Sequence, residues 1–190
     1  MNTPDGSELR AIATKDHHGS NQFQVVPCTR WKELQGSLCY HIQLAGFLEA
    51  STMFRMLNNP GRSVGPQEFM VSGGNADQVQ QAVNIVQAAT PRGVTPLAKH
   101  LEAIRSQIVS METELRNNDQ QAVIVLATDG LPSDDQGHSS EAVLRTFVDS
   151  LKNLQSLPVW IVVRLCTDDE GVVDYYNSLD QEVSFDNLFA

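Results

Sequence analysis

One apolar segment constrains the fold of this chain more than any other. Residues 122–127 (Ala-Val-Ile-Val-Leu-Ala) form an uninterrupted apolar run of strand length, and the run ends abruptly at Thr128-Asp129-Gly130. Such a run is typical of a strand that is buried on both faces of a parallel sheet. Because ligands of open α/β sheets collect outside the carboxyl ends of the strands, Asp129 is placed where a metal ion or a polar partner would bind.

The rest of the chain alternates between helical and extended patterns. We expect a helix over 29–48 with Thr29 as its N-cap, a second that starts after Asn75 or Asp77, and others over 96–115, 143–154 and 170–179. Strands are expected over 52–57, 67–72, 122–128, 159–165 and 183–185. This order predicts an α/β fold with a mostly parallel sheet and helices on both faces. Residues 1–28 are polar and show no helical period, so we expect a loop or disordered tail there and one domain over 29–190.

Composition and charge exclude several classes of function. The formal net charge of −10 would repel nucleic-acid backbones and anionic membranes, so neither is an expected partner. No run approaches the length of a membrane span, and the N-terminus has no apolar leader segment. The three cysteines, Cys28, Cys39 and Cys166, show neither zinc-ligand spacing nor a disulfide framework, so a reduced compartment, the cytoplasm, is expected.

Two motifs together resemble a known family. Gly-Val-Thr-Pro-Leu at residues 93–97 precedes the longest amphipathic helix, and Thr-Asp-Gly at 128–130 ends the apolar strand. In this order they resemble the von Willebrand factor type A domain, over roughly residues 29–186. The resemblance implies a Rossmann-like three-layer sandwich with a metal-ion-dependent adhesion site. It makes Thr95 and Asp129 candidate metal ligands.

The family's first motif, Asp-x-Ser-x-Ser after the first strand, does not occur in the sequence. The nearest fragment, residues 5–9, has Leu9 in place of the second Ser. We therefore expect the first, central strand of the sheet and its motif to lie upstream of Met1. Alternatively, residues 23–26 supply a degenerate first strand, which would place Pro27, Thr29 and Trp31 at the motif positions; that version cannot hold a metal.

The resemblance implies a protein–protein interaction module rather than an enzyme. Its partner would bind through a divalent metal at the carboxyl edge of the sheet, with an acidic side chain of the partner completing the metal shell, and Gly130, Pro132 and Asp134 are the candidate partner-binding residues. Mg²⁺ prefers six oxygens, so two protein ligands predict weak binding or none. A purely structural reading stays open, in which Thr95 caps the helix that follows it and Asp129 turns its loop.

A second class of function is a Mg²⁺-dependent hydrolase or phosphotransfer enzyme. Its acidic cage would consist of Asp129, Asp134, Asp168 and Asp169. Such chemistry needs a base or nucleophile near the metal, and the sequence offers none that can be placed there.

Overall fold

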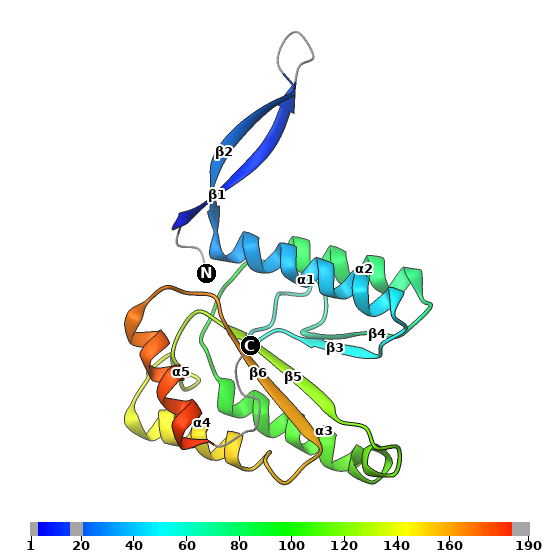
Figure 1. Cartoon of the computed structure of the whole chain (residues 1–190), viewed down its shortest axis with the longest axis vertical. Helices are drawn as coiled ribbons and strands as arrows, with labels where there is room; N and C mark the ends of the chain where they lie inside the picture. Colours follow the sequence, from blue (N-terminus) through cyan, green and yellow to red (C-terminus); the bar gives the residue numbers. More distant parts are fainter. Residues whose placement is uncertain (1–3, 16–20, 184–190) are drawn as a thin grey trace. The chain divides into compact units, whose positions relative to one another are not determined.

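The computed structural model describes residues 4–15 and 21–183, and it shows a mixed α/β protein (Figure 1). The chain divides into two compact units, Met1–Arg92 and Gly93–Ala190. Within the described residues, the strands form three two-stranded sheets, of which one is parallel. None of the described helices is both long and apolar enough to cross a membrane.

The first unit begins with an antiparallel strand pair, β1 (Pro4–Lys15) and β2 (Asn21–Thr29). For residues 4–15 and 21–28 this differs from the prediction of a loop or tail over residues 1–28, and residues 1–3 and 16–20 lie outside the described part. Antiparallel pairing uses main-chain groups, which a polar sequence supplies as well as an apolar one. The absence of a helical period therefore did not distinguish a loop from a strand pair. Residues 23–26 pair with β1 and therefore do not supply a first strand beside the predicted strand at 52–57.

The first helix begins at its predicted cap, and the second begins after Asn75, one of the two starts that the sequence left open. Helix α1 (Arg30–Phe47) starts after Thr29, whose hydroxyl accepts a hydrogen bond from the Lys32 N–H at 3.2 Å. Helix α2 (Ala76–Ala88) starts after Asn75, whose side chain accepts from the Gln78 N–H at 3.1 Å.

The two helices pack on an antiparallel pair, β3 (Thr52–Arg55) and β4 (Glu68–Val71). The buried Gln35 amide donates to the Val86 carbonyl at 2.8 Å, which ties α1 to the end of α2. The core of the unit consists of Ile42, Ala45, Val71, Ala82, Val83 and Val86.

The second unit confirms the predicted order of elements over residues 97–182. It consists of α3 (Leu97–Asn117), β5 (Ala122–Thr128), α4 (Glu141–Lys152), β6 (Val159–Leu165) and α5 (Glu170–Glu182). Strands β5 and β6 are parallel and in continuous register. Val183 ends α5 as its cap, so the short strand predicted at 183–185 is not seen at its first residue, and residues 184–185 lie outside the described part.

The β5–β6 pair is buried on one face only. Ile124 and Leu126 are 8% exposed, whereas the intervening Val123 and Val125 are 61% and 62% exposed. The expectation that this strand is buried on both faces was therefore wrong for the described structure. In Figure 1 helices α3 and α4 run along the same side of the pair. The apolar run predicted the strand correctly, but it could not show how many faces are covered.

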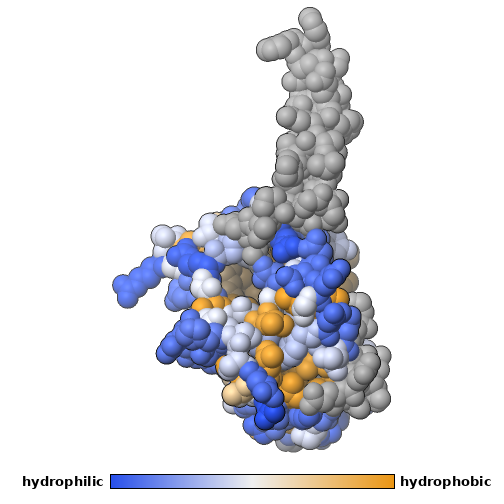
Figure 2. All heavy atoms as spheres, turned by 90° about the vertical axis from the view of Figure 1, so that its left-hand side faces the viewer, coloured by the Kyte–Doolittle hydropathy of each residue, from blue (hydrophilic) through white to orange (hydrophobic). Residues whose placement is uncertain are grey.

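The described strands do not join into the single, mostly parallel sheet that the sequence predicts. Strand β3 pairs with β4 and strand β5 with β6, each on one edge only. Part of the apolar surface accordingly stays open to solvent. On the face drawn in Figure 2, a cluster of hydrophobic residues lies among hydrophilic residues.

Candidate binding site at the carboxyl end of strand β5

Two loops that are far apart in sequence meet beside the end of β5. The Thr95 N–H donates to the Ser133 hydroxyl at 2.9 Å, and the Ser133 N–H donates back to the Thr95 carbonyl at 2.8 Å. The structure thus joins the loop of the first motif, residues 93–97, to the segment that follows the second, residues 128–130. Ser133 was not among the predicted site residues, because nothing local in the sequence marks a hydrogen bond across 38 positions.

The side chain of Thr95 is not used by this clamp. Helix α3 has no side-chain capping hydrogen bond; Pro96 occupies its cap position, and the Leu97 N–H bonds to the Thr95 carbonyl at 2.8 Å. The idea that Thr95 caps the helix with its hydroxyl was therefore wrong. Within the described residues the half-buried Thr95 hydroxyl makes no hydrogen bond, so its oxygen is available to a ligand.

The Thr-Asp-Gly turn is held from inside the fold. Thr128 is 1% exposed, and its hydroxyl lies 3.1 Å from the Gly130 carbonyl and 3.3 Å from the Gly130 nitrogen. The hydroxyl of Tyr176, from α5, donates to the same carbonyl at 3.2 Å. Asp129 is thereby presented between two fixed neighbours, and its side chain is half-buried.

Tyr176 is fully buried and keeps its proton. Burial raises its pKa well above the usual value of a phenol, and the neighbouring Tyr175 acts in the same direction, whereas a hydrogen bond with Thr128 acts against them. Sequence analysis missed this residue. The available signal was its place at helical spacing between the apolar Val172 and Leu179, which are also buried.

The predicted partner-binding residues have structural duties of their own. One oxygen of Asp134 accepts from the Gln136 and His138 N–H groups at 2.9 and 2.8 Å, and these backbone hydrogen bonds, the one from His138 first, hold the pKa of Asp134 below its usual value.

Pro132 is buried, and its carbonyl accepts from the Ser139 hydroxyl at 2.8 Å. The Gly130 carbonyl is taken by Tyr176. The second oxygen of Asp134 faces the His138 ring at 3.6 Å.

The described residues supply few candidate ligands for a metal ion. The described residues contain no group of three or more His, Cys, Asp or Glu side chains that could hold a metal. Thr95 and Asp129 can offer two of the six oxygens that Mg²⁺ prefers. In the rival acidic cage, Asp134 braces its own loop and Asp169 caps α5 by accepting from the Val172 N–H at 3.1 Å.

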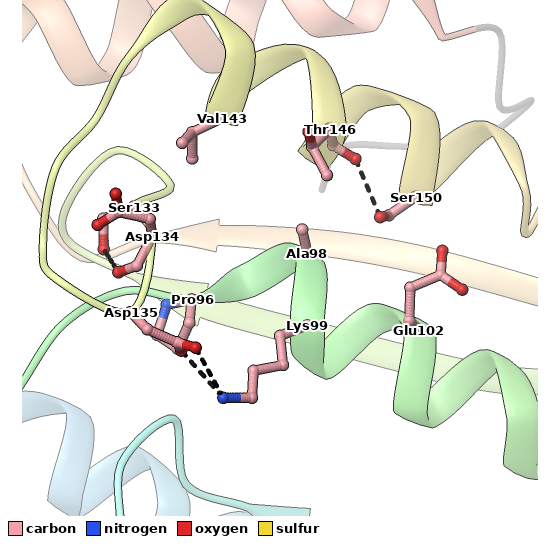
Figure 3. Close-up of a pocket in the computed structure, with 10 residues that line it drawn as sticks. All are labelled: Pro96, Ala98, Lys99, Glu102, Ser133, Asp134, Asp135, Val143, Thr146 and Ser150. Carbon is pink, nitrogen blue, oxygen red and sulfur yellow. Dashed lines mark hydrogen bonds and ion pairs between the residues drawn. The ribbon is translucent and has the colours of Figure 1, made fainter.

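A cleft of about 370 Å³ adjoins the clamp between α3 and α4 (Figure 3). Ala98 lines it from α3 and Val143 from α4, and Lys99 is paired with Asp135 at 3.0 Å on its rim. The loop that carries Ser133 therefore borders a hollow rather than a flat surface. The lining residues are Pro96, Ala98, Lys99, Glu102, Ser133, Asp134, Asp135, Val143, Thr146 and Ser150.

Comparison with known proteins identifies no relative of this chain. No protein-family model matches the chain, and no curated protein or solved structure shows significant similarity to it.

Proposed function

We propose that this chain is a protein–protein interaction module of the von Willebrand type A kind that binds its partner with the loops at the carboxyl end of β5. In this proposal the parallel β5–β6 pair belongs to a Rossmann-like, three-layer sandwich, and the protein acts in the cytoplasm without catalysing a reaction. The supporting features are the order of the two motifs and the clamp between Thr95 and Ser133.

The free hydroxyl of Thr95 is the observation that carries the proposal. Both main-chain groups of Thr95 are engaged, yet its side-chain oxygen has no partner among the described residues. A polar group that is held in place without a partner gains a hydrogen bond or a metal contact when a ligand arrives, and it costs little entropy to order. Thr95 therefore suits ligand binding better than a purely structural role.

Mg²⁺ has a supporting part in this proposal. Thr95 and Asp129 would each contribute one oxygen, and an acidic side chain of the partner would contribute another. The ion would be held firmly only when the partner is present. Gly130 and Pro132 would shape the loop around it, and the outer oxygen of Asp134 would meet the partner directly.

The test uses the 190-residue chain and a short peptide that contains glutamate, with the glutamine version of the same peptide as its control. We expect the glutamate peptide to bind in the presence of Mg²⁺ and to lose most of its affinity in EDTA. Thr95→Ala should weaken binding about tenfold, the effect of roughly 1.4 kcal/mol. Thr95→Ser, which keeps the hydroxyl, should restore it, and Thr113→Ala on the exposed side of α3 should have no effect.

Two results would overturn the proposal. One is equal binding of the glutamate and glutamine peptides whether or not Mg²⁺ is present. The other is Mg²⁺-dependent hydrolysis of p-nitrophenyl phosphate that disappears in Asp129→Asn, which would favour the enzyme instead.

A further inference from the structure

The cleft between α3 and α4 is a second place on this unit where a ligand can bind. Its volume of about 370 Å³ falls within the range of small-ligand sites, roughly 300–1,000 Å³. All the residues that line it belong to the second unit, so its shape is set within that unit. Figure 3 shows Ser133 and Asp134 at one end of the cleft and Glu102 toward the other. The cleft therefore runs along the two helices.

The middle of the cleft is apolar. Ala98 from α3 and Val143 from α4 lie there, and both are half-buried. Glu102 follows Ala98 by one helical turn and Ser150 follows Val143 by two, which corresponds to about 6 and 10 Å along the helix axes. A side chain that lies on the two apolar residues and also reaches the polar groups beyond them needs a stem of several carbons.

The hydroxyl groups of the cleft can only accept hydrogen bonds from a ligand. The Thr146 hydroxyl donates its proton to the Ala142 carbonyl at 2.9 Å, and the Ser150 hydroxyl donates to the Thr146 carbonyl at 3.0 Å. The Ser133 hydroxyl donates to the Asp134 carbonyl at 3.2 Å. Each hydroxyl has a single proton, so these groups have lone pairs left and no donor.

The charged side chains of the cleft leave an excess of negative charge. Lys99 is the one Lys or Arg among the lining residues, and its ammonium is paired with Asp135 at 3.0 and 3.1 Å. Glu102 makes no ion pair with any described residue, and its carboxylate accepts a long hydrogen bond of 3.5 Å from a neutral amide. The outer oxygen of Asp134 faces the His138 ring, which is charged only when protonated. The cleft therefore suits a donor that carries positive charge.

The charge of the whole second unit acts in the same direction. Residues 93–190 contain sixteen Asp and Glu residues against six Lys and Arg, a net charge of −10, whereas residues 1–92 contain seven of each kind. The net negative charge of the chain thus belongs entirely to the unit that carries the cleft. A field of this sign attracts a basic partner over distances beyond direct contact.

We propose that the cleft between α3 and α4 binds a lysine side chain of the partner protein. The aliphatic stem lies on the apolar middle of the cleft, and the ammonium reaches the acceptors of Glu102, Thr146 and Ser150. An ammonium donates in three directions and suits separate acceptors, whereas the planar fork of arginine suits paired oxygens. The proposal rests on the proposed function only in taking the ligand to be a protein, because the cleft uses neither Mg²⁺ nor Thr95 and Asp129.

The test uses the 190-residue chain in EDTA and two capped pentapeptides. One peptide has a central lysine, and the other has norleucine, which keeps the four-carbon stem without the ammonium. Amide chemical shifts of the ¹⁵N-labelled chain should report millimolar binding of the lysine peptide at residues 98–102 and 143–150, weaker as salt is added. The norleucine peptide should cause no saturable shifts. Since EDTA removes Mg²⁺, failure of this test leaves the metal-dependent glutamate binding of the proposed function untouched, and the reverse also holds.

Two matched pairs of variants separate the cleft from the general negative charge of the unit. Glu102→Gln should weaken binding of the lysine peptide about threefold, the scale of one exposed ion pair. Glu114→Gln makes the same charge change at an exposed position of the same helix and should have no effect. Ala98→Met should fill the cleft and abolish the binding, whereas Ala103→Met, at an exposed position of α3, should not.

Three results would overturn the proposal. The first is equal binding of the lysine and norleucine peptides. The second is equal weakening by Glu102→Gln and Glu114→Gln, which would mean a diffuse attraction to the acidic unit. The third is a set of lysine-dependent shifts that lies outside the cleft. If Ala98→Met does not fold, the two glutamine variants still decide between these results.

Discussion

At the scale of single residues, neutral hydrogen bonds hold Thr95 and Gly130 in the candidate site. Ser133 holds Thr95 through two of them, and Tyr176 holds Gly130 through a third. Neutral contacts of this kind depend on geometry and change little with salt. These contacts should therefore persist over a wide range of ionic strength. A substitution that removes a single side-chain oxygen should nevertheless break the contact which that oxygen makes.

The clamp predicts the effect of Ser133→Ala. Removing the hydroxyl takes the acceptor from the Thr95 N–H, which should destabilise the protein by about 1–3 kcal/mol in chemical unfolding. Hydrogen exchange at the Thr95 amide should become faster. Ser110→Ala, which removes a hydroxyl exposed on α3, is the control and should alter neither quantity. Unchanged protection of the Thr95 amide would show that the clamp does not form in solution.

The buried phenol predicts a loss of stability in alkali. Because the pKa of Tyr176 is raised in the folded state, the folded protein keeps this proton after the unfolded chain has lost it. The contribution of Tyr176 is therefore complete below the unfolded pKa of about 10 and declines as the pH rises above it. In urea unfolding up to about pH 11, Tyr176→Phe should show a shallower decline than the wild type.

The exposed Tyr40 supplies the control for this measurement. Tyr40→Phe should decline in alkali as steeply as the wild type does. At neutral pH Tyr176→Phe should also cost about 1 kcal/mol, because the Gly130 carbonyl loses one of its two hydroxyl donors and keeps Thr128. Parallel curves for wild type and Tyr176→Phe would contradict a buried, hydrogen-bonded phenol.

At the scale of elements, the close contact of α1 with α2 depends on a glycine. A Cβ atom added to Gly46 would lie 2.5 Å from Cγ2 of Val79, whereas one added to Gly36 on the same helix would meet nothing within 4 Å. The two glycines of α1 thus have opposite expected behaviour. Gly46→Ala should destabilise the protein by about 1–3 kcal/mol through overpacking.

Gly36→Ala is the matched variant on the same helix. It should stabilise the protein by about 0.5–1 kcal/mol, since alanine is the better helix former and no atom obstructs it. Thermal unfolding of both variants measures the difference. Equal midpoints for the two would mean that α1 and α2 do not approach each other at Gly46.

The sequence predicted elements better than it predicted their pairing. The start of α1 after Thr29 was predicted, and that of α2 after Asn75 was one of two alternatives, because capping side chains bond within three residues. Strand pairing is set by contacts that are remote in sequence. The pairing of β1 with β2 was therefore missed, and one parallel sheet was expected where the described strands form separate pairs.

At the scale of the whole molecule, the candidate site also combines local sequence patterns with contacts that are remote in sequence. The motifs around Thr95 and Asp129 are visible in the sequence as short patterns. The contacts from Ser133 to Thr95 and from Tyr176 to Gly130, which span 38 and 46 positions, are not. The hydrogen bonds that Asp134 accepts within its own loop were also missed. In a sequence, an acidic loop residue that stabilises its loop looks the same as one that binds a ligand.

A Mg²⁺ titration of the uniformly ¹⁵N-labelled chain, followed by amide chemical shifts, tests the central claim most directly. The account predicts small shifts that reach saturation only at millimolar Mg²⁺, confined to residues 93–97 and 128–134, and lost in Asp129→Asn. Shifts that are absent from both loops, or that report micromolar binding at residues elsewhere, would contradict a ligand site at the carboxyl end of β5.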